Sequence, residues 1–200
     1  MNPILRSTLH GALGFAAVSL AAYSIWAFAP RLAGSEYGMY ALIALVFLAG
    51  SGLTMSGLLH GEKRLGRFYR MFLPAFFGYA LLWILAWVFV KGRPGEWLGA
   101  AAGTLFFSAV CWLWLRRPAG FWVGALVLFV LHTVGYFIGG EWMYSVSKVD
   151  NVTLAVAKVF LEGLTRQQLG IVAKLGWGLF HGLGFGAGIG FALGWWQRRS

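Results

Sequence analysis

The sequence predicts an all-α fold, a polytopic integral membrane helix bundle with about six transmembrane helices. Hydrophobic residues make up 60% of its 200 residues and charged residues only 11%, whereas about a quarter of the residues in an ordinary soluble domain are charged. The apolar residues are gathered into long runs without Asp, Glu, Lys or Arg. Each run is close to the roughly 20 residues that cross a hydrocarbon core. These runs use nearly all of the sequence, so we expect a single transmembrane domain over residues 1–200.

The six spans are expected at residues 11–29, 38–59, 71–90, 97–115, 118–140 and 175–196. A secretory signal is the alternative for the first, because Ala27-Phe28-Ala29 resembles a cleavage site. The run is longer than the roughly 7–15 residues of a signal's apolar region, and Pro30 follows it directly. We therefore favour a retained first helix. In the second span, the small and hydroxyl residues of AGSGLTMSG at 49–57 are typical of a close contact between membrane helices.

Clusters of basic residues follow the second and the fourth spans. The connection after the second span, HGEKRLGRFYR at 60–70, is the most charged loop, and its interleaved aromatic residues suit a segment lying at the membrane interface. The fourth span ends in WLWL before two arginines, a common finish for a membrane helix. We expect the following basic residues to orient the protein and to contact lipid head groups: Lys63, Arg64, Arg67, Arg70, Arg116 and Arg117.

The longest connection, residues 141–174, contains a repeat of apolar residues at helical spacing: Val152, Val156, Val159, Phe160 and Leu164. This pattern predicts a short amphipathic helix at about 152–164, lying along the membrane surface or over the mouth of the bundle. The short loops on the side of the two termini carry most of the basic residues. The positive-inside rule therefore places both termini in the cytoplasm, and we expect a bacterial inner membrane protein.

Glycines dominate the last span. Gly182, Gly186, Gly190 and Gly194 recur every fourth residue, and Gly184 and Gly188 form a second, shorter register. Residues four apart lie one above another on a helix, so the ladder predicts a face on which another helix approaches at backbone distance. That helix could belong to this chain, to a further copy or to another membrane protein. Gly178 lies outside the ladder and is expected to tolerate a side chain better.

The acidic residues exclude several kinds of chemistry. All six carboxylates, Glu36, Glu62, Glu96, Glu141, Asp150 and Glu162, fall in predicted loops or at span ends. This placement argues against paired-carboxylate catalysis inside the membrane. The single cysteine and the absence of zinc-type spacing predict no metal site. The net charge of +10 lies on short loops rather than on a solvated basic face, so we expect no nucleic-acid partner.

Two histidines lie within predicted spans. His132 and His181 fall in the same half of the bilayer on antiparallel helices that are adjacent in sequence, so their rings could face one another. The plainest interpretation is two neutral histidines bonded to neighbouring groups, with no cofactor. The alternative is a site that holds haem, a chlorophyll-type pigment or a metal, or that relays protons.

His181 also opens a short motif. His181, Gly184 and Gly188 spell HxxGxxxG, which resembles the histidine helix of rhomboid-type intramembrane serine proteases. That resemblance implies a serine nucleophile on the fourth helix. The fourth span offers Ser108 in LFFSAVC, without the GxSG motif, and the AGSG sequence around Ser51 lies on the second span. We therefore expect no catalytic residues.

Two functions of different classes follow from these patterns. The first is a non-enzymatic packing or scaffold subunit of a membrane complex, whose contacts come from the glycine ladder and from residues 49–57. Its partners would be membrane lipids and another membrane protein or a further copy of the chain. The alternative is a small transporter, channel or lipid-handling protein with an intramembrane site at His132, His181 and Tyr136.

Overall fold

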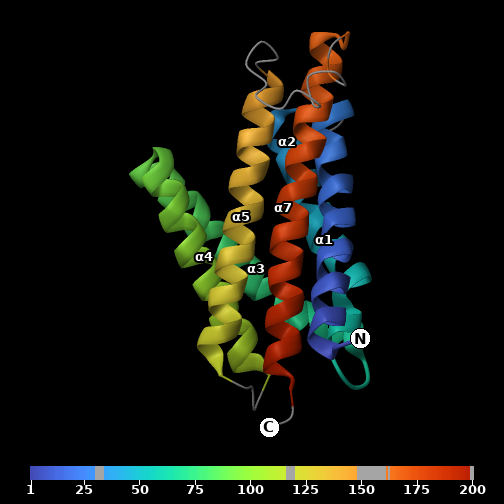
Figure 1. Cartoon of the computed structure of the whole chain (residues 1–200), viewed down its shortest axis with the longest axis vertical. Helices are drawn as coiled ribbons and strands as arrows, with labels where there is room; N and C mark the ends of the chain where they lie inside the picture. The colour runs from blue at the N-terminus through green and yellow to red at the C-terminus, as the bar shows by residue number, and fades with distance from the viewer. Residues whose placement is uncertain (30–33, 116–119, 148–160, 162, 199–200) are drawn as a thin grey trace.

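The computed structural model describes residues 1–29, 34–115, 120–147, 161 and 163–198, and these residues contain helices and turns but no strand. The long helices are α1 (Pro3–Phe28), α2 (Glu36–Met55), α3 (Arg64–Val90), α4 (Gly92–Trp114), α5 (Phe121–Ser147) and α7 (Arg166–Trp196), and a short 3-10 turn, η1 (Ser56–Leu58), follows α2. α1 begins and α7 ends at the same end of the bundle, which we call the terminal end (Figure 1).

Within the described residues, five helices are long and apolar enough to cross a membrane: α1, α2 with η1, α3, α4 and α5. The prediction of a membrane-spanning helix bundle is confirmed at this level. α7 has 31 residues, but its many glycines, His181 and its tryptophans lower its mean hydropathy. Its place between α1 and α5 (Figure 1) is therefore the main support for counting it as a sixth span.

The helices extend beyond the predicted spans. α3 begins at Arg64, so Arg64, Arg67 and Arg70 form its first two turns, where a loop was expected. α5 continues to Ser147 and α7 begins at Arg166, which shortens the predicted connection 141–174 from both sides. A charge-free run marks the part of a helix in lipid, whereas the helix itself continues into the polar interface.

A capping box sets the start of α7. The Thr165 hydroxyl accepts a hydrogen bond from the Gln168 backbone N–H at 3.3 Å, and Gln168 Oε1 accepts one from the Thr165 N–H at 2.8 Å. The predicted amphipathic helix at 152–164 falls almost entirely outside the described residues, as do Arg116 and Arg117.

α7 packs against α1 and α5 through two glycine faces. A Cβ atom at Gly186 would clash with the carbonyl oxygen of Gly11 on α1. On the other face, a Cβ at Gly184 would lie 2.8 Å from the Cα of Gly135 on α5. The remaining ladder glycines also meet α1: Gly182, Gly190 and Gly194. In this structure the helix that approaches the ladder is therefore α1 of the same chain.

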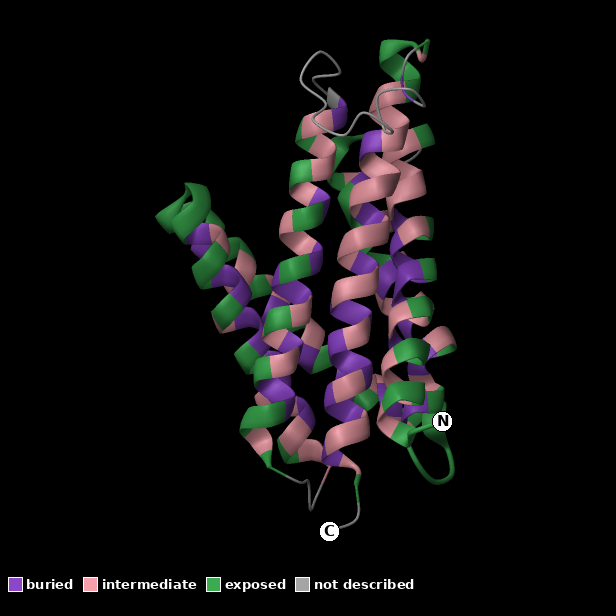
Figure 2. Ribbon diagram, in the orientation of Figure 1, coloured by how far each residue is buried: buried purple, intermediate pink, exposed green. Residues whose placement is uncertain are grey.

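Aromatic rings fill the middle of the bundle around Phe185 of α7, which is fully buried. Its ring centroid lies 5.2 Å from that of Phe15 on α1 and 5.6 Å from that of Phe107 on α4. The tyrosine ring of Tyr79 on α3 stacks on it at 4.8 Å. Figure 2 shows the buried residues running along the facing sides of α1, α5 and α7.

Hydrogen bonds close the terminal end of the bundle. The Gln197 side-chain amide donates to the Leu58 carbonyl at 2.9 Å and accepts from the His60 N–H at 3.0 Å. The indole N–H of Trp195 donates to the Gly120 carbonyl at 3.2 Å. These bonds join the end of α7 to the loops after α2 and before α5.

The opposite end is more open, because the α3–α4 hairpin leans away from the other helices there (Figure 1). Its tip is exposed (Figure 2), and Phe89 has 78% of its surface accessible. The start of α4 contacts α5 across this gap. Arg93 pairs with Glu141 at 2.7 Å, and the rings of Trp97 and Phe137 lie 4.9 Å apart.

Candidate functional site

His132 and His181 converge near the middle of the bundle, since His181 lies midway along α7 (Arg166–Trp196) and His132 lies near the middle of α5 (Phe121–Ser147). Their ring centroids lie 5.7 Å apart, with the ring planes 82° from each other. The backbone contact between Gly135 of α5 and Gly184 of α7 lies close to both histidines in the sequence. The absence of side chains at these two glycines is what allows α5 and α7 to bring the imidazoles together.

His132 is a fully buried part of the core. Its Nε2 atom is hydrogen bonded to the Tyr79 hydroxyl at 2.6 Å, and its ring packs on Phe185 at 5.1 Å between centroids. Nδ1 of His132 has no hydrogen-bond partner among the described residues. Nε2 of His132 is therefore hydrogen bonded to Tyr79, whereas Nδ1 has no partner among the described residues.

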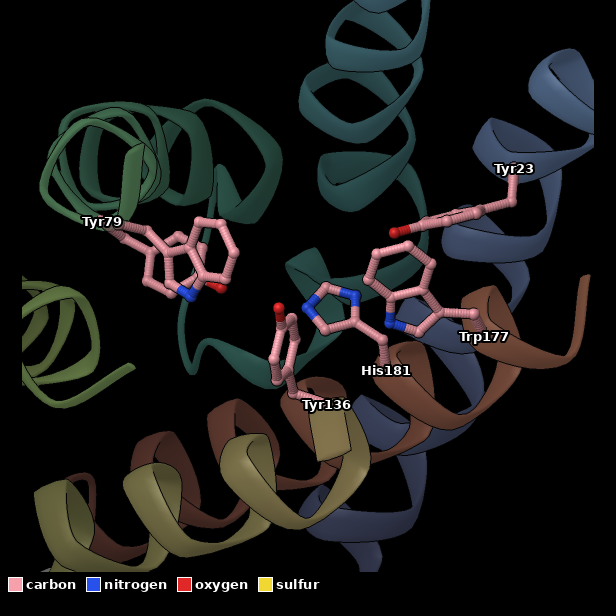
Figure 3. A pocket seen from close by; sticks show the side chains of 6 residues that line it. Tyr23, Tyr79, Tyr136, Trp177 and His181 are labelled. Carbon is pink, nitrogen blue, oxygen red and sulfur yellow. The ribbon is translucent and has the colours of Figure 1, made fainter. Parts of the chain in front are cut away.

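His181 lines a cavity of about 210 Å³ between α1, α3, α5 and α7, together with Tyr23, Tyr79, Trp83, Tyr136 and Trp177. Figure 3 shows the His181 ring between Tyr136 and Trp177, with the hydroxyl groups of Tyr23 and Tyr136 directed into the same space. All six lining side chains are aromatic and none is an acid, lysine or arginine. The cavity wall is thus apolar, with a few polar atoms.

Several of those polar atoms lack partners. The indole nitrogens of Trp83 and Trp177 and Nδ1 of His181 are buried and make no hydrogen bond to any described residue. The hydroxyl groups of Tyr23 and Tyr136 likewise have no hydrogen bond within the described part of the chain. Buried polar groups are nearly always paired in folded proteins, so three buried unpaired nitrogens among the residues of one cavity are unusual.

Glycines on neighbouring helices hold the aromatic walls. A Cβ atom added at Gly139 would run into the Trp177 ring, and one at Gly103 would lie 2.7 Å from the Tyr79 ring. Gly178 lies under Tyr23, where an added Cβ would be 2.9 Å from the ring. Gly178 therefore differs from our expectation of a tolerant position, because the Tyr23 ring occupies the space that a side chain at Gly178 would need.

A second cavity of about 240 Å³ adjoins the first. Its lining comes from α1, α2 and α7: Tyr23, Trp26, Tyr40, Ile43, Phe47 and Trp177. Tyr23 and Trp177 line both cavities, with ring centroids 5.8 Å apart. Tyr40 is 52% exposed, so this second cavity reaches the outer surface of α2.

The geometry does not fit haem or a chlorophyll-type pigment. A macrocycle held between His132 and His181 would have to separate α5 from α7, whose glycine backbones are in contact. The cavity is also smaller than the roughly 300–1,000 Å³ of pockets for drug-sized ligands. Among the described residues, no group of three or more His, Cys, Asp or Glu side chains could hold a metal ion.

The rhomboid-like arrangement is not assembled either. The rings around His181 are those of Phe15, His132 and Phe185. Ser108 Oγ is buried without a hydrogen-bond partner among the described residues, and the Ser51 hydroxyl donates to the Phe47 carbonyl at 2.6 Å. A nucleophile needs a base within hydrogen-bond reach, and neither serine is bonded to His181.

The described basic residues predicted to meet lipid head groups lie at the terminal end. Arg67 donates to the His60 carbonyl at 2.7 Å and lies over the Trp114 ring at 5.4 Å. Arg64 donates to the Gly61 carbonyl at 2.9 Å. These two arginines therefore also hold the loop between α2 and α3, while Lys63 and Arg70 are exposed.

Four cavity residues were not predicted from the sequence: Tyr23, Tyr79, Trp83 and Trp177. They come from three helices, and only Tyr79 and Trp83, four residues apart on α3, are related by a helical spacing. Comparison of the chain with protein-family models, with curated proteins and with solved structures gave no match. The function therefore has to be argued from the site.

Proposed function

We propose that this protein binds a small, neutral, membrane-soluble amphiphile in the aromatic cavity around His181, as a lipid-handling protein does. The observation that supports this most is the cavity of about 210 Å³, walled by aromatic rings and carrying unpaired hydrogen-bonding groups. Pockets of this kind bind a ligand's apolar body through their walls and orient it through a few polar atoms. The absence of charged side chains from the lining favours a neutral ligand.

A channel through the bundle agrees less well with the structure than a ligand-binding cavity does. A channel needs a continuous polar or gated path, but the cavity ends at the buried Phe185 cluster. Beyond it, α1, α5 and α7 are in glycine contact, and Gln197 bonds to the loop after α2. A ligand would therefore arrive and leave on the side away from the terminal end, or sideways from lipid.

The scaffold hypothesis stays a prediction. The glycine ladder and the small-residue patch that suggested it pack against other parts of the same chain. α1 covers the glycine ladder of α7. In the patch at 49–57, Gly50 lies against Val18 and Gly52 against the Tyr69 ring. A partner protein would have to dock on another surface.

We further propose a bacterial inner membrane location with both termini in the cytoplasm. The terminal end carries Arg6, Lys63, Arg64, Arg67, Arg70 and Arg198, and the opposite end carries Lys91, Arg93, Arg166 and Lys174. An excess of basic residues near the ends of spans favours the cytoplasmic side.

Cysteine labelling in cells tests this orientation. Cys111 is buried and is the single cysteine, so the Cys111→Ala variant has no cysteine that a maleimide could label. We expect a membrane-impermeant maleimide to label Lys91→Cys in intact spheroplasts and Glu62→Cys only after lysis. The reverse pattern would show that the termini face the periplasm.

Ligand binding is tested by extracting the protein from its native membrane in polymer-bounded lipid discs and identifying the retained small molecules by mass spectrometry. We expect at least one lipid-soluble species to be enriched in the wild type over bulk membrane. Gly139→Ala places a methyl group against the Trp177 ring and should reduce that enrichment at least about tenfold, because a displaced wall removes both contact and volume.

The matched control is Gly140→Ala, next along α5, where an added Cβ has no atom within 4 Å. It should keep the enriched species, and circular dichroism should show that all three proteins are equally helical. The same lipid profile in the three proteins would contradict binding in this cavity.

A further inference from the structure

We infer that the ligand's head is a quinone ring, held in the His181 cavity, and that its alkyl tail runs through the second cavity toward lipid. This inference rests on the proposed function and names the chemical class of ligand. The two cavities adjoin at Tyr23 and Trp177, which line both.

The polar groups of the first cavity are mainly donors. An indole N–H can only donate, and those of Trp83 and Trp177 are unpaired among the described residues. The Tyr23 and Tyr136 hydroxyls can each donate or accept, and a neutral His181 ring donates from one nitrogen and accepts at the other. All five groups can therefore donate at once to a ligand that offers acceptor oxygens. A quinone has two carbonyl oxygens and no N–H or O–H group.

The walls select a flat ring of limited size. Tyr79 and Trp83 come from α3, Tyr136 from α5 and Trp177 from α7, so aromatic faces and edges surround the space (Figure 3). Aromatic rings prefer offset-stacked or edge-to-face neighbours at about 4.5–7 Å between centroids. A volume of about 210 Å³ accommodates one substituted six-membered ring rather than a macrocycle.

The second cavity gives the tail a route. It begins at the Tyr23 and Trp177 pair that it shares with the first cavity and continues past Ile43 and Phe47 to the exposed Tyr40. Its lining contains no charged residue. An apolar tail attached to the ring would thus pass between α1 and α2 to the outer surface of α2.

An aromatic cage for a quaternary ammonium group is the competing ligand chemistry, because cations bind over aromatic faces. A quaternary ammonium forms no strong hydrogen bonds, so it would leave the five unpaired donor groups of the cavity unsatisfied. The donors therefore favour the quinone, and the cation becomes one outcome of the test.

Equilibrium binding of a tritiated decyl-substituted benzoquinone to the protein in phospholipid nanodiscs tests the inference, with binding to empty nanodiscs subtracted. We expect saturable binding at a single site. Removing one hydroxyl with Tyr136→Phe or Tyr23→Phe should weaken it about three- to tenfold, the usual effect of losing a hydrogen bond. Tyr37→Phe is the control, since Tyr37 is 87% exposed and lines neither cavity, and it should leave affinity unchanged.

Competition by two other compounds tests the chemical class of the ligand's head group. The reduced quinol should compete several-fold more weakly than the quinone, because its hydroxyl hydrogens need acceptors and the indole N–H groups of Trp83 and Trp177 offer none. Decyltrimethylammonium should compete least, and stronger competition by it than by the quinone would replace the quinone with a cationic head group. The absence of saturable quinone binding would overturn the inference. The proposed function would still stand if the native extract of the wild type contains a retained molecule that Gly139→Ala loses.

Discussion

Gly186→Leu is expected to remove most of the folded protein. Even a Cβ atom at this position clashes with the Gly11 carbonyl of α1, and its next contact is the Phe15 side chain at 2.6 Å. Overpacking a core by a few methylene groups costs about 1–3 kcal/mol when neighbours can shift, but here the obstacle is backbone. The α1–α7 contact would have to open along its length. Size-exclusion chromatography in mild detergent should show less than about a tenth of the wild-type monodisperse peak, since 1.4 kcal/mol is already tenfold.

The same substitution at Gly170 is the matched control. Gly170 also lies on α7, and a Cβ added there has no atom within 4 Å. Gly170→Leu changes hydrophobicity and helix propensity in the same way as Gly186→Leu but makes no clash, so its peak should be close to that of the wild type. Equal losses in the two variants would show that leucine harms this helix through something other than contact with α1.

The helical membrane fold could be predicted because hydropathy reports directly on the solvent around a segment. Five charge-free runs correspond to five helices long and apolar enough to span a membrane. Helix ends were harder to predict, since a helix continues into the interface until a local signal stops it. The Thr165 capping box is such a signal, and Thr165 lies ten residues before the run that begins at Leu175.

The site could be predicted only in part. Counting residues along antiparallel helices predicted that His132 and His181 could face one another, and the structure brings their ring centroids to 5.7 Å. The aromatic walls could not be found this way. Trp177 lies over Gly139 and Tyr23 over Gly178, and such ring and glycine pairs depend on which helices are neighbours and in what register. A single sequence does not show which residues on different helices come into contact.

Losing the Tyr79 hydroxyl should destabilise the bundle by about 1–2 kcal/mol, the upper part of the range for hydrogen bonds between membrane helices. Tyr79→Phe keeps the ring that stacks on Phe185 and leaves both nitrogens of His132 without a partner among the described residues. An unsatisfied buried polar group costs more than the net worth of its bond. Unfolding in mixed SDS and dodecyl maltoside micelles, followed by circular dichroism, measures the change.

A double-mutant cycle separates this hydrogen bond from packing. His132→Leu alone removes an aromatic ring and leaves the Tyr79 hydroxyl unpaired, whereas Tyr79→Phe with His132→Leu removes both polar groups together. Because the two side chains are bonded at 2.6 Å, the double variant should be more stable than the sum of the single losses predicts, by about 0.6–1.7 kcal/mol. Strict additivity would mean that His132 is satisfied in the membrane by something other than Tyr79, and water or a ligand at the adjoining cavity would then be the group to identify.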